Sequence, residues 1–132
     1  MTHLPMRHRQ SSAVAVAAVL SVLSCAAPTD VIGGRLVVGV APPVLHLTNR
    51  SPAPVYFFAI EGGLAMRANW GPCTDPAHCR GIAAGGSFAL PLDDVAGYHA
   101  EAKTLLVYWW HLIPGGPTGF HPDSIRVAGA QL

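Results

Sequence analysis

The chain has 132 residues, enough for one domain, and its 8 Lys and Arg against 7 Asp and Glu leave a formal net charge of +1. Such a balance gives no electrostatic basis for nucleic-acid binding. Apolar residues make up 51% of the chain and charged residues 11%, which rules out a disordered polymer, and the 14 Gly and 12 Pro argue against a helical bundle.

The first 24 residues have the pattern of a secretory signal peptide. Arg7 and Arg9 precede the apolar run 13–23, and small residues follow that run. A membrane-spanning helix needs about 20 apolar residues. Because this run is about half as long, we predict export rather than a spanning anchor.

Residues 22–25, Val-Leu-Ser-Cys, resemble the lipobox of bacterial lipoproteins. The resemblance implies that diacylglycerol is attached to the sulfur of Cys25, that the leader is cut before this residue, and that the new amino group is acylated. Because Ala26 rather than Asp follows, it also implies outer-membrane sorting where the organism has an outer membrane. Membrane lipid is then the expected partner, and two or three acyl chains make attachment effectively permanent. An ordinary cut near Ala27 is the alternative.

Residues 25–34 are expected to form a flexible tether, and residues 35–132 the folded domain. Short apolar runs alternate with turn residues such as Pro42-Pro43 and Gly85-Gly86. Seven short strands in this length favour an all-β domain, a small antiparallel β-sandwich of immunoglobulin-like type. One helical turn capped by Asp93 is expected within 93–99. The expected strands are 35–40, 44–49, 55–61, 64–70, 87–92, 104–112 and 124–130.

Gly62-Gly63 predicts a two-residue hairpin loop that joins strands 55–61 and 64–70. In that register one face is wholly apolar and is expected in the core. The other face is mixed, with Phe58 opposite Arg67 and Tyr56 opposite Asn69. This mixed face is either a surface that binds another envelope protein or a surface covered by residues 71–84 or another strand. The apolar face consists of Val55, Phe57, Ala59, Met66, Ala68 and Trp70.

Strand 104–112 is apolar on both sides, which is typical of a central strand. Its neighbours Trp109 and Trp110 must point to opposite faces. One of them is expected in the core, and the other is either covered by a loop or exposed for binding.

Cys73 and Cys79 flank a polar loop. With Cys25 lipidated they form the remaining pair, and an exported protein forms a disulfide by default. The alternative is a copper or zinc site that uses the two thiolates and a nearby residue such as His78. A structural zinc site needs four ligands, and a redox pair is typically Cys-x-x-Cys.

The sequence contains no convincing catalytic motif. Ser87 follows two glycines, but Ala89 replaces the final Gly of a nucleophile elbow. Asp93 and Asp94 could form a carboxylate pair, but sequence neighbours rarely converge on one substrate, and helix capping explains Asp93 equally well. The formal glycosylation motif at Asn49 is explained by a turn. We therefore expect a non-enzymatic binding or accessory module of the cell envelope, with no cofactor.

Overall fold

The structure is a computed structural model that describes residues 35–117 and 119–132. The expected signal peptide, the lipobox and the tether up to residue 34 lie outside the described residues. Within the described ranges, no helix is long and apolar enough to cross a membrane.

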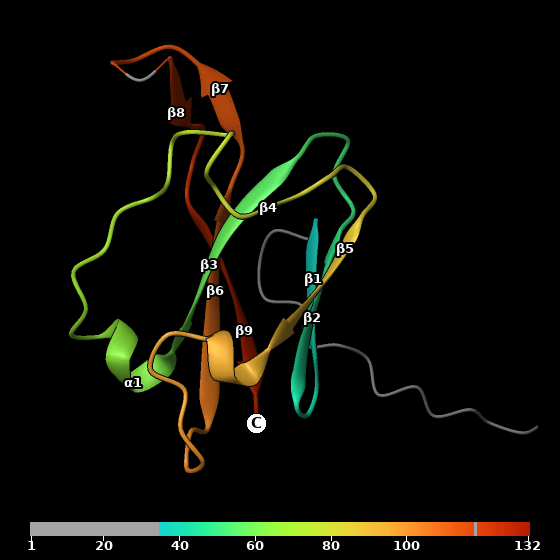
Figure 1. The fold of residues 1–132 in the computed structure, drawn as a ribbon, viewed down its shortest axis with the longest axis vertical. Helices are drawn as coiled ribbons and strands as arrows, with labels where there is room; N and C mark the ends of the chain where they lie inside the picture. Colours follow the sequence, from blue (N-terminus) through green and yellow to red (C-terminus); the bar gives the residue numbers. More distant parts are fainter. Residues whose placement is uncertain (1–34, 118) are drawn as a thin grey trace, which may run out of the picture.

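The described chain is mostly β-structure, arranged in antiparallel sheets (Figure 1). The first sheet has the order β1-β2-β5, and the second has the order β4-β3-β6-β9. A small hairpin, β7-β8, extends beyond the end of β6. The strands are β1 (Leu36–Ala41), β2 (Val44–Asn49), β3 (Val55–Glu61), β4 (Gly81–Ile82), β5 (Ser87–Pro91), β6 (Thr104–Trp110), β7 (Leu112–Pro114), β8 (Phe120–Pro122) and β9 (Arg126–Gln131).

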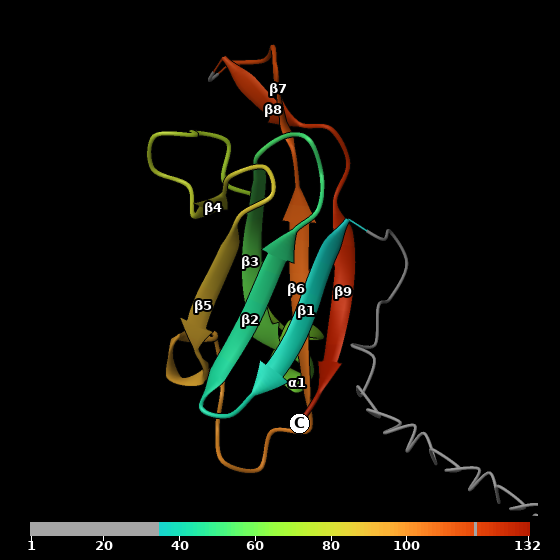
Figure 2. The same ribbon diagram turned by 90° about the vertical axis from the view of Figure 1, so that its right-hand side faces the viewer.

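The two larger sheets lie face to face (Figure 2) and share one hydrophobic core. Alternate side chains point inward, as the period of two in a strand requires. Leu45 and Leu47 come from the first sheet, while Leu105, Val107 and Trp109 come from the second, and all five are almost fully buried. The prediction of an all-β domain is thereby confirmed, as is the core position of one of the paired tryptophans.

The predicted hairpin between 55–61 and 64–70 is wrong. After β3 the chain enters the short helix α1 (Gly62–Ala65), because the Glu61 carboxylate accepts hydrogen bonds from the N–H groups of Gly63 and Leu64. A Cβ at Gly62 would lie 2.2 Å from Thr104 Oγ1, so this close approach requires glycine. β3 pairs instead with β6, from Tyr56 to Glu61. Of the predicted apolar face, Val55, Phe57 and Ala59 are buried, whereas Met66 is 89% exposed.

Other differences are local. The run predicted as strand 104–112 ends as β6 at Trp110, and the hairpin β7-β8 follows, with the Pro-Gly-Gly-Pro segment 114–117 at the end of β7. The two-residue strand β4 was not predicted. The expected helical turn is a 3-10 turn at Leu92–Asp94, which begins after Pro91 and has no side-chain cap, so the predicted role of Asp93 as a cap is wrong.

A buried polar cluster ties the loop after β2 to the loop after β4. The amide nitrogen of Asn49 donates to the carbonyl oxygens of Ala53, Ile82 and Ala83, at 2.8, 3.0 and 3.2 Å. Its amide oxygen accepts from the backbone N–H and the hydroxyl of Ser51, at 2.9 and 2.7 Å. Asn49 is fully buried, so this residue has a structural role and the glycosylation reading is not supported.

Candidate binding site

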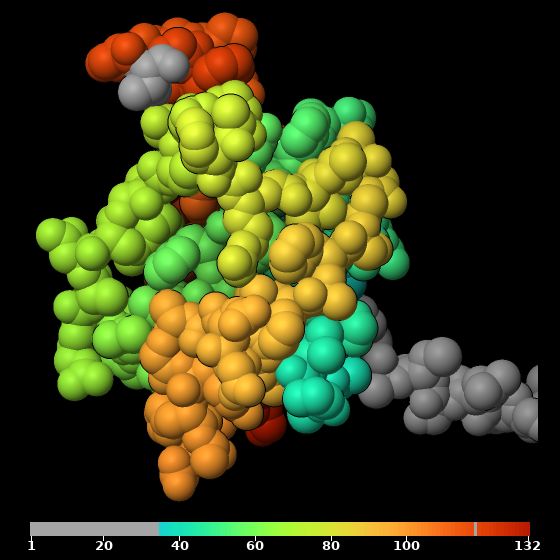
Figure 3. Space-filling view, viewed as in Figure 1, coloured from blue at the N-terminus to red at the C-terminus, as the bar shows by residue number. Residues whose placement is uncertain are grey.

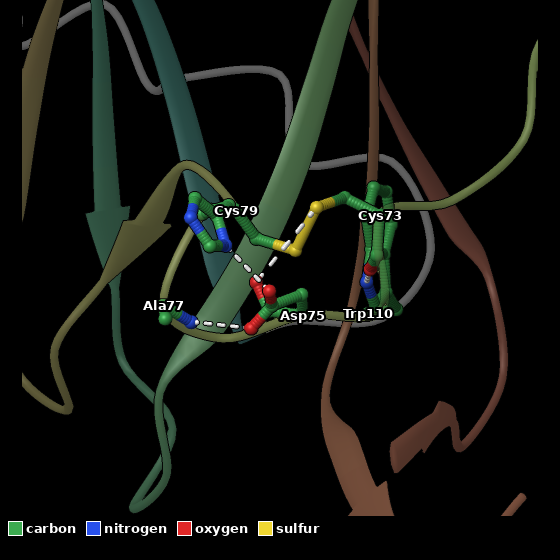
Figure 4. The surroundings of a disulfide bond; sticks show 6 residues. Cys73, Asp75, Ala77, Cys79 and Trp110 are labelled. Carbon is green, nitrogen blue, oxygen red and sulfur yellow. Dashed lines mark hydrogen bonds and ion pairs between the residues drawn. A yellow bond between two sulfur atoms is a disulfide. The ribbon is translucent and has the colours of Figure 1, made fainter. Parts of the chain in front are cut away.

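Cys73 and Cys79 form the predicted disulfide, with their Cα atoms 5.6 Å apart (Figure 4). The bridge closes a loop that follows the segment 66–72, which has no regular secondary structure, and leads into β4. Both sulfurs are bonded to each other, so neither is a free thiolate for a metal. Among the described residues, no three His, Cys, Asp or Glu side chains come together as a metal-binding group.

Asp75 organises the inside of this loop. Its carboxylate accepts hydrogen bonds from the Nδ1 of His78 at 2.5 Å and from the N–H of Ala77 at 3.0 Å, and its carbonyl oxygen accepts from the N–H of Cys79 at 2.8 Å. The hydrogen bond from His78, followed by that from Ala77, holds the pKa of the Asp75 carboxyl below its ordinary value. The loop is therefore ordered by its own backbone as well as by the disulfide.

The loop is docked on the outer face of the second sheet through aromatic side chains. The Nε1 of Trp110 donates to the carbonyl oxygen of Cys73 at 3.0 Å (Figure 4). The Trp70 ring packs against the rings of Phe58, Tyr108 and Trp110, with centroids 5.1, 4.7 and 6.2 Å away. Trp110 is therefore covered by the loop rather than exposed, which selects one of the two alternatives left open by the sequence.

The four residues predicted to form a mixed binding face do not form one. Phe58 and Tyr56 lie half-buried on β3, and Phe58 faces Trp70 instead of Arg67. Arg67 and Asn69 are exposed in the segment after α1, where the N–H of Arg67 donates to the carbonyl oxygen of Leu64. The pairings of Phe58 with Arg67 and of Tyr56 with Asn69 are wrong, because no hairpin forms at Gly62-Gly63.

A cavity of about 340 Å³ lies between the disulfide loop, the outer edge of β3 and the segment after the 3-10 turn. In Figure 3 the green atoms of β3 lie in a hollow between the yellow-green loop and the orange segment. This volume is near the lower end of the ~300–1,000 Å³ range of small-ligand sites. The lining residues are Phe57, Phe58, Ala59, Cys73, His78, Cys79, Arg80, Asp94 and Ala96.

The outer edge of β3 is paired on both sides of this cavity but not within it. At one side β4 pairs with Val55 and Tyr56, and the N–H of Phe57 donates to the carbonyl oxygen of Arg80 at 3.3 Å. At the other side, the N–H of Ala96 donates to the carbonyl oxygen of Ala59, and the carbonyl oxygen of Ala96 accepts from the N–H of Glu61.

The N–H and C=O of one strand residue point to the same side. The N–H of Phe57 and the carbonyl oxygen of Ala59 are hydrogen-bonded at the outer edge of β3. The carbonyl oxygen of Phe57 and the N–H of Ala59 therefore face the same edge. Within residues 35–117 and 119–132, neither of these two groups has a backbone partner across that edge. The cavity thus presents one acceptor and one donor at the spacing of a β-ladder.

Opposite charges stand at the two sides of the cavity. Arg80 lies at the side of the disulfide loop, and Asp94 lies at the side of Ala96. Neither residue takes part in an ion pair with any described residue. The guanidinium of Arg80 lies 5.8 Å from the centroid of the Phe88 ring, which helps to hold it at the cavity.

Sequence reasoning pointed to the cysteine loop but not to the cavity, because the lining residues come from three separate segments. The polar residues between Cys73 and Cys79 were the available signal, whereas Asp94 stood out only beside Asp93 and Ala96 carried no signal. Comparison of the chain with known protein families, with characterised proteins and with solved structures gives no match.

Proposed function

We propose that this protein is an exported lipoprotein, anchored to the membrane through an acylated Cys25, whose β-domain is a non-enzymatic binding module of the bacterial cell envelope. The domain belongs in the periplasm or at the cell surface. The leader, with its basic start, apolar run and lipobox-like residues 22–25, supports export and acylation.

The observation that carries this proposal is the bridge between Cys73 and Cys79. Disulfides persist in oxidising compartments and are rare in the bacterial cytosol. The bridge uses two of the three cysteines. Cys25 is left without an intramolecular partner, as a lipidated cysteine must be.

We further propose that the domain is an immunoglobulin-like β-sandwich. Support comes from the strand orders β1-β2-β5 and β4-β3-β6-β9, which correspond to the A-B-E and C′-C-F-G sheets of that architecture. The shared core of the two sheets fits the same assignment. The architecture hosts many functions, so the binding role rests on the cavity and not on the fold.

Intact mass spectrometry of the membrane fraction tests the anchoring. We expect the mass of the chain from residue 25 onward plus two or three acyl groups, and a gain of two hydrogens on reduction of the Cys73–Cys79 bridge. The matched control is Cys25→Ala, which should accumulate unlipidated. A soluble wild-type product that begins downstream of residue 25 would overturn the assignment.

A further inference from the structure

We propose that the β7-β8 hairpin lies against the surface of a membrane that contains anionic phospholipids. This inference rests on the proposed anchoring through Cys25 and adds a second contact with the bilayer, made by the folded domain itself. The hairpin contributes none of the residues that line the cavity.

The hairpin projects beyond the end of the domain, away from the two larger sheets (Figure 1). Residues 112–122 contain no Asp, Glu, Lys or Arg. Ile113 of β7 is 40% exposed, and Ile125, in the segment that joins β8 to β9, is 45% exposed. Large apolar side chains that are exposed together mark a surface that contacts a membrane or another protein.

The backbone of the hairpin suits the headgroup layer of a bilayer. A two-stranded hairpin has two open edges, and the need to satisfy every backbone N–H and C=O excludes such edges from the hydrocarbon core. The strands β7 and β8 each end in a proline, Pro114 and Pro122, which has no N–H to satisfy. The N–H of Gly115 donates to the carbonyl oxygen of Gly119, and the N–H of Gly119 donates to that of Gly116. Fewer N–H groups therefore depend on water for a partner.

The position of the proposed lipid attachment favours a membrane over a protein as the partner of the hairpin. The first strand of the domain starts at the hairpin end (Figure 2). The ten residues 26–35 lead from Cys25 into this strand, and ten residues cannot span more than about 36 Å. An acylated Cys25 therefore keeps the start of β1 within that distance of the bilayer, and the hairpin is what projects from this end.

Charges are divided unequally between the two ends of the described domain. The half with the hairpin holds four arginines against two aspartates, and the other half holds two cations against four carboxylates. An anionic surface therefore attracts the hairpin end and repels the opposite end. The hairpin half holds Arg35, Arg50, Arg80, Arg126, Asp75 and Asp123. The other half holds Arg67, Lys103, Glu61, Asp93, Asp94 and Glu101.

Two of the arginines are available to headgroup phosphates. Arg35 and Arg50 lie side by side, where the N–H of Arg50 donates to the carbonyl oxygen of Arg35 at 2.6 Å. Both residues are exposed, and neither takes part in an ion pair with any residue that the structure describes. The attraction of an arginine to an anionic membrane extends over about one Debye length, ~8–10 Å, so the two charges act without touching the lipid.

The test uses the ¹⁵N-labelled full-length protein as cells produce it, in nanodiscs of phosphatidylcholine and phosphatidylglycerol. A nitroxide on the lipid, placed near the headgroup, broadens the NMR signals of nearby amides. The amide signals of Ile113 and Phe120 should be broadened strongly, whereas those of Glu101 and Lys103, at the opposite end, should keep their intensity. Equal broadening at both ends would refute the contact.

Ile113→Ser and Met66→Ser form a matched pair of variants. Each replaces an exposed apolar side chain by a hydroxyl, but Met66 lies beside α1 in the other half and is 89% exposed. Ile113→Ser should lower the ratio of docked to undocked molecules about threefold, because only part of the Ile113 surface is left to bury. Met66→Ser should leave the ratio unchanged. A larger effect of Met66→Ser than of Ile113→Ser would overturn the proposal.

The charge contribution is tested with two double variants that each remove two exposed cations. Arg35→Gln with Arg50→Gln should lower the docked ratio about fivefold when phosphatidylglycerol is present. The same variant should match the wild type in nanodiscs of phosphatidylcholine alone. Arg67→Gln with Lys103→Gln changes the opposite half and should not lower the ratio. Equal losses in the two double variants would refute the orienting role of the charges.

The outcomes separate this contact from the proposed anchoring. A lipidated protein whose hairpin signals are not broadened would refute the membrane contact, leave the anchoring intact and point to a protein as the partner of the hairpin. A soluble, unlipidated protein whose hairpin signals broaden when nanodiscs are added would refute the anchoring and leave the contact intact.

Discussion

Removal of the Asn49 side chain should be among the most destabilising single changes in the domain. Asn49→Ala deletes a fully buried amide and leaves the buried backbone N–H of Ser51 without its present partner, while the Ser51 hydroxyl keeps the carbonyl oxygen of Ala53. A buried polar group left unpaired costs about 1–3 kcal/mol, and each ordinary hydrogen bond lost costs about 1 kcal/mol. The unpaired N–H, together with the bonds lost by the Ser51 hydroxyl and the Ile82 carbonyl, gives an expected loss of about 3 kcal/mol, out of the 5–15 kcal/mol typical of a whole domain.

Thermal and urea unfolding of the oxidised protein measure this loss. For a domain of this size, about 3 kcal/mol corresponds to a fall in Tm of roughly 12–24 °C. The matched control is Asn69→Ala, since Asn69 is exposed and should cost less than about 0.5 kcal/mol.

A second variant separates hydrogen bonding from loss of volume. Asn49→Asp keeps the shape but turns a carboxylate toward three carbonyl oxygens. The pKa of this buried carboxyl should be raised, so the folded state binds its proton more tightly and the variant should recover stability as pH falls from about 7 to about 5. Our reasoning would be refuted if Asn49→Ala cost less than about 1 kcal/mol, or if Asn49→Asp unfolded with the pH dependence of the wild type.

Further predictions concern the bridge, the ion pair and one glycine. Replacing both Cys73 and Cys79 by Ser should lower the free energy of unfolding by about 2 kcal/mol, because the bridge closes a short loop; an unchanged urea midpoint would contradict this. Partial burial raises the pKa of the Asp123 carboxyl, but the hydrogen bonds led by that of Arg126 outweigh it and leave the pKa lowered. The associated stability is present above the ordinary pKa of about 4 and is lost as pH falls through the lowered value, so Asp123→Asn should unfold with a shallower acid dependence than the wild type. Gly97→Ala should destabilise by about 1–3 kcal/mol, because Gly97 has a φ of +74° and a Cβ there would lie 2.5 Å from Leu64 Cδ2; equal melting temperatures would speak against that contact.

The position of a strand could be predicted from the sequence where alternate residues of an apolar run are the buried ones. The runs that became β2, β3 and β6 have buried residues at every second position, so their inward faces follow from the period of two. Which strand lies beside which is a different matter, because β3 pairs with β6 across more than forty residues of chain. No local pattern encodes such a contact.

The error at Gly62-Gly63 shows how a local pattern misleads. Two glycines between apolar runs suit a primed turn, but glycine at 62 is also what a close approach to Thr104 requires. The carboxylate of Glu61 favours the helix over the hairpin turn, because it caps α1. As a result, Trp70 reaches the outer face of the sheet along the loop and not as a strand partner. The cavity was unpredictable for the same reason, because loop and edge meet only in the folded chain.

β1 begins at the end of the domain that also carries the β7-β8 hairpin, while the C-terminus lies at the opposite end (Figure 2). A tether upstream of β1 would therefore join the domain at the end opposite Leu132. An affinity tag fused after Leu132 would lie at the far end of the domain from that attachment.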